Sequence, residues 1–576
     1  MNSLLFDRHE VLALLRKRVE GFLSGYRQNL AVLGPEGMGK STLLRHFLKD
    51  ELPPMGHLMP IYLEVSGEEN LVEWATRFVQ TLLYAVLQMR RQQALPAQLS
   101  ELLEVCSTLV PQTAALAKRI LSLADAGKSD EAYSQLWDLP QMATQETEHR
   151  VLLVLDEFHR LRCLAVREPF QALGKKIMVQ GTTLFLVVSS ELGAARSILR
   201  EGLALLFGQF EAVEISGLSA ASCRRAIRSV WPETRGDLFL EYIFMELAQG
   251  HPHRLNLLLE VLERDLSTRG PVESGHFILE LLEGLFLSPQ SAVRQQFEAR
   301  LRSLPSHRSR TFYTQVLGVV AGGAHRFSKI SEAVGRSPSQ VKRALQVLQE
   351  AQLIVKRGIF YEIPDRLFQL WMVTAHPVLQ GVGLVGQEQA RHTFREVTRI
   401  WLQGVQGAIR RPVVERVAEL MRQWQDELTE IEGRRTLLPE FKEVEVIPGP
   451  GDRPSVLARR RAGKKGGWWV VPWTDSLDEG QARQLVQQLR HFLPFKEYRK
   501  VLIGIHPVEI NARLVLQEGR IRLWDLQGFN SLLDLYGLTR LPVPEGVVEF
   551  SGQMVPMLEG VKTPQQRVSD STEVVG

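Results

Sequence analysis

A glycine-rich octet near the amino end of the sequence has the residue types and spacing of a phosphate-binding loop. It follows the pattern G-x-x-x-x-G-K-[ST] and closes with Lys40 and Ser41. Glycines let successive backbone N–H groups turn inward around a β-phosphate, while the lysine reaches the β- and γ-phosphates and the serine hydroxyl ligates Mg²⁺. We predict a nucleotide-binding loop made of the octet and the threonine after it: Gly34, Pro35, Glu36, Gly37, Met38, Gly39, Lys40, Ser41 and Thr42.

The segments on either side of the octet are the two elements that such a loop requires. Residues 29–34 (NLAVLG) indicate a buried strand, and residues 40–52 indicate an amphipathic helix whose positive end would face the phosphates. The alternative is a glycine turn that merely joins a strand to a helix. Agreement between the fixed positions and both flanking elements favours the phosphate loop.

Two carboxylates follow a second apolar segment. Residues 151–155 form a run typical of a central parallel strand, and Asp156 and Glu157 stand at its carboxyl end. Ligands bind at this end of a doubly wound sheet. We expect Asp156 to hold Mg²⁺ through water, and Glu157 to act as the base or to orient the nucleophilic water. A surface Asp-Glu pair after a core strand is the alternative.

A third apolar strand, residues 184–188, ends in Ser189 and Ser190, where a sensor of the γ-phosphate would lie. Serine after a strand is also ordinary turn chemistry, so that alternative stays open. Residues 57–67 and the amphipathic segment after them supply a further βα unit, which predicts a parallel, helix-covered sheet. Residues 85–147 have helical spacing and are longer than a crossover needs, so we expect a helical insertion.

Several stretches together resemble the archaeal-type ATPase family, which belongs to the AAA+/STAND-like P-loop ATPases. They are the loop, the Asp-Glu and Ser-Ser strands, LLFDRHEVLALLRKRV at 4–19, LALLFGQFEAVEISGLS at 203–219 and AQGHPHRLNLLLEVL at 248–262. The resemblance spans residues 4 to 375. It implies that Asp7 and Arg8 help to hold adenine, and that the turn Gly250-His251-Pro252 lies at a lid over the nucleotide. It also implies ATP in preference to GTP.

Arginines that act on the nucleotide are harder to place. Arg196 and Arg200 follow the Ser-Ser strand on a helix, in the region from which AAA+ proteins offer an arginine finger to a neighbouring subunit. Arg254 follows the Gly-His-Pro turn and is a candidate lid arginine. Solvated arginines on a helix surface are the alternative reading.

Residues 311–365 predict a winged helix-turn-helix: helix, Gly-Gly turn, helix, GRSPS turn, helix and two short strands. We expect Ser337 or Ser339 to cap the recognition helix. The cations placed to meet a phosphate backbone lie near the start of that helix and in the wing: Arg336, Lys342, Arg343, Lys356 and Arg357. A winged helix that serves only as a protein-docking or lid element is the alternative.

The last third, residues 385–545, begins with two segments that predict amphipathic helices, 390–405 and 411–428. Strands and a helix follow, in an order similar to that of a restriction-endonuclease-like domain. Such a nuclease needs Glu-x-Lys on the strand that reads Val470-Val471-Pro472-Trp473 here, so we predict an α/β nuclease-like fold without nuclease activity. The basic run 458–465 is either a hairpin that faces nucleic acid or a solvated turn.

Length and composition limit the class of protein and the number of domains. The chain has 576 residues, a formal net charge of +4, 44% hydrophobic residues and three scattered cysteines, and it shows no apolar run of membrane-spanning length and no export signal. We therefore expect a cytoplasmic protein. The predicted domains are an ATPase core (1–217), a helical lid (218–300), the winged helix (301–380), the nuclease-like domain (385–545) and a disordered tail (556–576).

The sequence thus predicts an α/β chain in which a P-loop ATPase hydrolyses ATP with Mg²⁺ and couples its nucleotide state to the winged-helix and C-terminal domains. Double-stranded DNA or a protein is the expected partner of the winged helix, and a homo-oligomer is compatible with the finger arginines. The alternative function is a DNA- or protein-binding regulator that keeps ATP as a structural ligand with little turnover.

Overall fold

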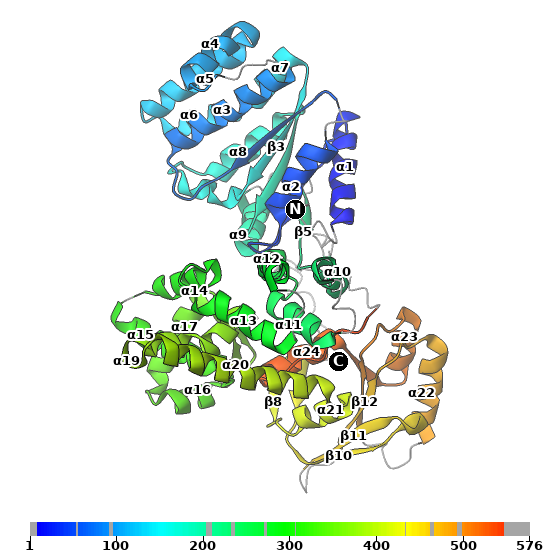
Figure 1. Cartoon of the computed structure of the whole chain (residues 1–576). Helices are drawn as coiled ribbons and strands as arrows, with labels where there is room; N and C mark the ends of the chain where they lie inside the picture. Colours follow the sequence, from blue (N-terminus) through cyan, green and yellow to red (C-terminus); the bar gives the residue numbers. More distant parts are fainter. Residues whose placement is uncertain are drawn as a thin grey trace, which may run out of the picture. The chain divides into compact units, whose positions relative to one another are not determined.

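The computed structural model describes residues 8–52, 56–90, 96–202, 210–231, 237–269, 274–305, 307–431, 434–460, 466–491 and 498–545 (Figure 1). These residues divide into two compact units. The first contains the described residues up to Ser222 together with His251–His253, and the second contains those of 223–250 and 254–545. Among the described residues, no helix is long and apolar enough to cross a membrane.

A five-stranded parallel sheet forms the centre of the first unit. Its strands, in spatial order, are β2 (Leu58–Glu64), β3 (Arg150–Asp156), β4 (Thr183–Ser189), β1 (Asn29–Leu33) and β5 (Phe210–Glu214). Every residue of β1 and β4 is buried, as strands covered on both faces require. The parallel P-loop sheet is therefore confirmed, and it brings the carboxyl ends of β1, β3 and β4 to one edge.

Helices cover both faces of this sheet, as Figure 1 shows. The covering helices are α1 (His9–Leu23), α2 (Lys40–His46), α3 (Leu71–Met89), α8 (Pro169–Val179) and α9 (Leu192–Ser197). Alternate residues of β3 point to opposite layers: Leu152 and Val154 join the core that contains Leu43 of α2, whereas Leu153 and Leu155 join the core that contains Phe78 of α3.

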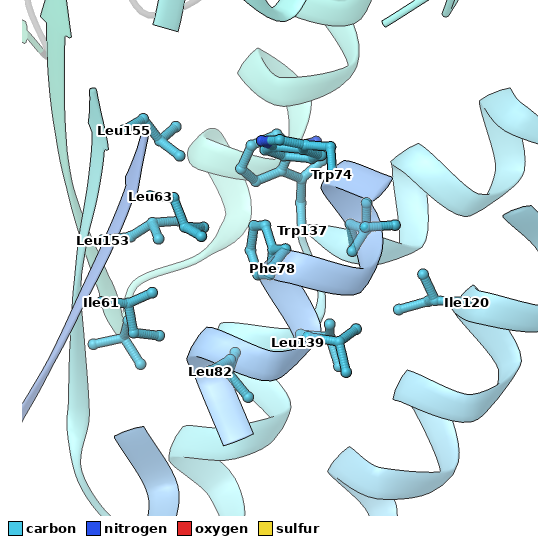
Figure 2. Packing of buried hydrophobic residues seen from close by; sticks show 14 of the residues in the cluster. Ile61, Leu63, Trp74, Phe78, Leu82, Ile120, Trp137, Leu139, Leu153 and Leu155 are labelled. Carbon is cyan, nitrogen blue, oxygen red and sulfur yellow. The ribbon is translucent and has the colours of Figure 1, made fainter. Parts of the chain in front are cut away.

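The predicted insertion contains four helices between α3 and β3: α4 (Leu99–Leu109), α5 (Pro111–Asp125), α6 (Ser129–Leu136) and α7 (Leu139–Thr147). They share one apolar core with the sheet (Figure 2). Trp74, Phe78 and Trp137 meet at its centre, with ring centroids 5.4 to 5.6 Å apart. Since aromatic rings bury large areas, this cluster fixes the insertion firmly against α3.

The second unit begins with helices that continue from the first: α10 (Ala220–Val230), α11 (Leu238–Ala248), α12 (Pro252–Arg269), α13 (Ser274–Leu287) and α14 (Ala292–Arg302). The elements predicted as a winged helix follow in the expected order: α15 (His307–Ala321), α16 (Phe327–Val334), α17 (Pro338–Glu350) and the hairpin of β6 (Val355–Arg357) and β7 (Phe360–Glu362). Of the two serines considered as caps of α17, Ser337 occupies the N-cap position and forms a capping box with Gln340.

The C-terminal part contains α18 (Arg366–Thr374), α19 (His376–Val385), α20 (Gln387–Arg410), α21 (Val413–Met421), α22 (Glu479–His491), α23 (Ile510–Glu518) and α24 (Leu526–Leu535). Its mixed sheet has the order β10 (Phe441–Pro448), β11 (Pro454–Arg460), β12 (Gly467–Trp473), β13 (Arg499–Gly504) and β14 (Ile521–Asp525). Strands β10 to β12 are antiparallel and β12 to β14 are parallel.

One expectation for this part is wrong. The amphipathic segment 411–428 was expected to be a single helix, but α21 ends at Met421 and the chain then forms a hairpin of β8 (Glu427–Ile431) and β9 (Arg434–Leu438). Asp426, with a φ of 59°, turns the backbone just before β8. From β8 onward the burial alternates residue by residue, which is the period of a strand.

Candidate nucleotide-binding site

The glycines of the loop are required by the backbone and its surroundings. Gly37 and Gly39 have φ values of 74° and 82°, and Gly39 is the N-cap residue of α2. A Cβ on Gly34 would lie 2.5 Å from the carbonyl oxygen of Ile215, and one on Gly37 would lie 2.2 Å from the ring of His251. The loop therefore has the tight turn and the close backbone approach that its sequence pattern predicts.

Lys40 is held inside this loop. Its side chain is buried, and its Nζ donates hydrogen bonds to the carbonyl oxygens of Gly34 (2.7 Å) and Pro35 (2.8 Å). Burial lowers the pKa of the Lys40 ammonium, while the nearby carboxylates of Glu157, Asp156 and Glu36 act in the opposite direction. The ammonium thus lies among the backbone groups that the sequence assigns to phosphate binding.

The predicted metal residues meet across the sheet edge. Ser41 Oγ donates a 2.6 Å hydrogen bond to Asp156 Oδ2, and the backbone N–H of Glu157 donates to Asp156 Oδ1 at 2.9 Å. A hydroxyl and a carboxylate supply oxygen atoms of the kind that Mg²⁺ takes as ligands. The described residues contain no cluster of three or more His, Cys, Asp or Glu residues that could hold a metal ion.

Tyr62 is a member of this site that the sequence analysis missed. Its hydroxyl donates a hydrogen bond to the same Asp156 oxygen that Ser41 contacts. Burial and this hydrogen bond to a carboxylate raise the pKa of Tyr62. In the β2–β3 register Tyr62 lies opposite Val154, two pairs before the strand ends at Glu64 and Asp156. A tyrosine close to the end of an otherwise apolar strand was the signal available in the sequence.

Glu157 is held by the serine pair at the end of β4. Its Oε2 accepts hydrogen bonds from the backbone N–H of Ser190 (3.1 Å) and from the Ser190 hydroxyl (2.8 Å). The buried hydroxyl of Ser189 lies 2.9 Å from Nδ1 of His159. His159 is a second residue that the sequence analysis missed. The structure thus brings together Asp156, Glu157, Ser189 and Ser190, and the γ-phosphate sensor role of the two serines stays a prediction.

The remaining residues predicted to contact the nucleotide differ in where the structure places them. Asp7 lies outside the described residues. Arg8 is buried and donates to the carbonyl oxygens of Met38 (3.2 Å) and Ser216 (2.9 Å), so it braces the loop backbone. Thr42 is exposed on α2, and Pro252 is the first residue of α12. Contact of Arg8 with adenine and the place of Pro252 at a lid over the nucleotide stay predictions.

The candidate finger and lid arginines all have acidic neighbours. Arg196 pairs with Glu214 at 2.6 Å and Arg200 with Glu201 at 3.3 Å. In the second unit, Arg254 pairs with Asp365 at 2.5 Å, and burial lowers its pKa. The side chain of Arg200 is the most exposed of the three, at 69%. Each pair would have to open before its arginine could act on a nucleotide.

The second unit presents cations on the predicted winged helix. Arg336, Lys342 and Arg343 are exposed, whereas Arg357 pairs with Glu362 at 2.6 Å. Lys356 Nζ lies 5.6 Å from the centre of the Tyr361 ring.

The basic run 458–465 is described only in part. Arg459 lies within 3.3 Å of carboxylate oxygens of both Glu443 and Glu445, so its own charge is paired. Residues 461–465 lie outside the described residues.

Trp473, the last residue of β12 and of the segment 470–473 in which a Glu-x-Lys was expected for a nuclease, is buried. The guanidinium of Arg453 lies 4.1 Å from its ring centre. The nuclease-like character of this domain and its lack of nuclease activity stay predictions.

One family model matches part of the first unit. Residues 4–176 match the family model described as AAA ATPase domain. No curated protein matches the chain. The match agrees with the geometry of the loop and of the carboxylate strand, and it confirms the predicted resemblance to AAA+ P-loop ATPases.

Similar solved structures include the Walker-type ATPase of Pyrococcus abyssi, which is 20% identical over 64% of this chain and 95% of that chain, with a TM-score of 0.39. The ORC2 protein of Aeropyrum pernix is 14% identical over 69% of this chain and 95% of that chain, with a TM-score of 0.36. A RuvB variant of Thermotoga maritima is 14% identical over 64% of this chain and 96% of that chain, with a TM-score of 0.31. At these TM-scores, assignment of the site depends on the family match and on the geometry.

Proposed function

We propose that this chain, whose residues 4–176 match the AAA ATPase domain, binds ATP with Mg²⁺, hydrolyses it and uses the nucleotide state to control its second unit. The observation that carries the proposal is the 2.6 Å hydrogen bond between Ser41 and Asp156. It joins the phosphate loop to the carboxylate strand. This junction supports a position near the γ-phosphate for Glu157, the residue that follows Asp156.

Each residue then has a defined task. Loop N–H groups hold the phosphates at the positive end of α2, and Lys40 exchanges its carbonyl acceptors for phosphate oxygens. Ser41 and Asp156 hold Mg²⁺, which neutralises charge on the phosphates when it is bound. Glu157 orients the attacking water and accepts its proton.

Two substitutions test this assignment. Glu157→Gln keeps the size of the side chain but removes the proton acceptor, so hydrolysis should fall about 100-fold or more while ATP binding persists. Lys40→Ala should weaken ATP binding itself, because it removes the cation that reaches the phosphates. Hydrolysis is measured as phosphate release and binding by calorimetry. Wild-type hydrolysis by Glu157→Gln would refute the catalytic assignment.

The control of the second unit is the finer part of the proposal. Exposed cations at the start of α17 favour contact with a nucleic-acid backbone, and a winged helix is a common reader of duplex DNA. A nucleotide switch requires that DNA or protein binding by the second unit differ between ATP and ADP. ATPase activity measured with and without duplex DNA tests this coupling, because binding effects between two sites are reciprocal.

A second function is favoured by the ion pairs of Arg196 and Arg254. Since both candidate arginines are engaged by carboxylates, turnover without a partner is expected to be slow, and ATP could then serve mainly as a structural ligand. In that case Glu157→Gln would leave binding of the partner intact. Under the switch hypothesis, the same substitution would trap the ATP state and change partner binding.

A further inference from the structure

We infer that Ser190 and His159 form a brace that holds Glu157 in one orientation, so that Ser190 acts as a positioning residue for the base instead of reading the γ-phosphate. The inference rests on the proposed function, because it assigns a role around the same carboxylate. It also changes the role expected for the serine pair at the end of β4.

Two donors of Ser190 bind one oxygen of Glu157. The backbone N–H lies 3.1 Å from Oε2 and the hydroxyl lies 2.8 Å from it. The N–H belongs to the residue directly after β4, whose position is set by a fully buried strand. Oε1 accepts no hydrogen bond from any residue that the structure describes, so this oxygen is left to receive a proton from water.

His159 closes the other side of the carboxylate. Its side chain is 1% exposed, its Nδ1 lies 3.3 Å from Glu157 Oε2, and its Nε2 lies 3.3 Å from Glu191 Oε1. The Nδ1 is also 2.9 Å from Ser189 Oγ, and that oxygen accepts a 3.1 Å hydrogen bond from the backbone N–H of Glu191. The ring is therefore fixed from three directions, and Glu157 has little room to rotate.

The backbone conformation of Glu157 also helps to fix the orientation of its side chain. Its φ of 53° and ψ of 39° are left-handed values that a residue other than glycine rarely adopts. Its N–H donates to Asp156 Oδ1, which stabilises the turn. Strained conformations of this kind persist where the surrounding structure enforces them, and they cluster at functional sites. Here the turn places the Glu157 side chain against the end of β4.

The two possible roles of Ser190, positioning Glu157 or contacting the γ-phosphate, predict different results. A residue that reads the γ-phosphate contributes to the affinity for ATP but not for ADP. A residue that only positions the base changes the rate of the chemical step and leaves both affinities unchanged. The contact of both Ser190 donors with Glu157 favours the second behaviour.

The test compares Ser190→Ala with Ser190→Thr and with a control serine, Ser24→Ala, whose hydroxyl contacts only the carbonyl of Glu20 among the described residues. Three quantities are measured for each protein. They are the single-turnover rate constant with saturating Mg²⁺-ATP, the dissociation constants of ATP and ADP, and the melting temperature. Ser190→Ala should lower the rate constant roughly 10- to 100-fold, with both affinities within about twofold of wild type. Ser190→Thr retains the hydroxyl and should recover most of the rate, and His159→Asn should resemble Ser190→Ala.

Three outcomes overturn the inference. The first is an unchanged rate constant in Ser190→Ala. The second is a higher rate constant, which would mean that the contact with Ser190 restrains Glu157. The third is a selective loss of ATP affinity, which would mean that Ser190 contacts the γ-phosphate. If Ser190→Ala does not fold, Ser190→Cys keeps the volume and weakens the donor, so the same readouts apply. Wild-type hydrolysis by Glu157→Gln refutes the proposed function itself, whereas an inactive Glu157→Gln beside a fully active Ser190→Ala refutes only the brace.

Discussion

Asp156 is the residue on which the candidate site converges. It accepts hydrogen bonds from Ser41, from Tyr62 and from the backbone of Glu157, so one carboxylate joins the loop, β2 and the start of the following turn. Hydrogen bonds to a charged acceptor are stronger than neutral ones. Asp156 is therefore expected to contribute to the stability of the first unit as well as to its chemistry.

Tyr62→Phe tests this residue-scale account. The substitution keeps the ring and removes one donor from a buried carboxylate, so the free energy of unfolding of the first unit should fall by about 1.5–3 kcal/mol. The matched control is Tyr84→Phe, which removes a 2.6 Å bond to the neutral carbonyl of Pro96 and should cost about 1 kcal/mol. Urea unfolding measures both. Equal losses of unfolding free energy in Tyr62→Phe and Tyr84→Phe would show that the charge of Asp156 does not strengthen its hydrogen bond with Tyr62.

The loop and the carboxylate pair could be predicted from the sequence because their chemistry follows local pattern. The apolar runs before Gly34 and Asp156 define two strands, and parallel strands in an α/β sheet present their carboxyl ends at one edge. Tyr62 and His159 could not be found in this way. Tyr62 enters the site through the pairing of β2 with β3, and His159 through a 3₁₀ turn that packs on the end of β4, and both placements are tertiary.

At the scale of elements, α17 is the helix to which the proposed function assigns contact with a nucleic-acid backbone. Its first turns carry Lys342 and Arg343 on exposed positions, while Val341, Ala344 and Leu345 face the core. Such a division between one apolar and one charged face is typical of a helix on the protein surface, and the role of α17 as a recognition helix stays a prediction.

The double substitution Lys342→Ala/Arg343→Ala tests duplex DNA binding by this face. If both residues contact phosphates, affinity should fall for every duplex sequence, and the slope of log K against log salt should become shallower by about 1.8. Lys128→Ala, an exposed lysine of the insertion, is the control. Fluorescence anisotropy at several salt concentrations gives the slopes. A wild-type slope in the double variant would contradict DNA contact by α17.

The hairpin of β8 and β9 shows why sequence patterns fail at some element boundaries. Met421, Trp424 and Leu428 have the spacing of one helix face, which predicts that α21 continues. In the structure Trp424 is buried after the helix has ended, whereas Leu428 is 50% exposed. Residues with the spacing of one helix face therefore belong to α21, to the turn after it and to β8. The positive φ of Asp426 marks the point where the backbone turns into β8.

Within the second unit, partly buried charges around the buried Asp534 join elements that are far apart in the sequence. Arg366 at the start of α18 pairs with Asp534 of α24 and lies 3.5 Å from Glu246 of α11. Arg540 binds both oxygens of Asp534 and lies 3.8 Å from Glu246. Breaking one member of such a buried network leaves uncompensated charge. The helices α11, α18 and α24 are therefore expected to unfold together as one cooperative body.

His325 lies beside this network and gives the second unit a pH dependence. Its Nδ1–H donates to the carbonyl of Tyr361 at 2.9 Å, and its buried Nε2 has no hydrogen-bond partner among the described residues. Burial lowers the pKa of His325; the Tyr361 carbonyl and Asp534 act against this shift and Arg366 acts with it. The folded protein therefore keeps His325 neutral at pH values where the unfolded chain, with a pKa near ~6.5, has bound a proton.

It follows that the stability of the second unit should fall as the pH drops below ~6.5, because the unfolded state then binds more protons than the folded one. His325→Gln retains a donor for Tyr361 and removes this ionisation, so between pH 7.5 and 5 the wild type should lose about 1 kcal/mol more than the variant. Glu246 and Glu362, whose pKa values burial raises, act in the opposite sense, but they are present in both proteins and cancel in the difference. Urea unfolding followed by tryptophan fluorescence measures the two curves, with the exposed His276→Gln as control. Parallel curves for the wild type and His325→Gln would show that His325 binds its proton equally well in the folded and the unfolded protein, so that burial does not lower its pKa.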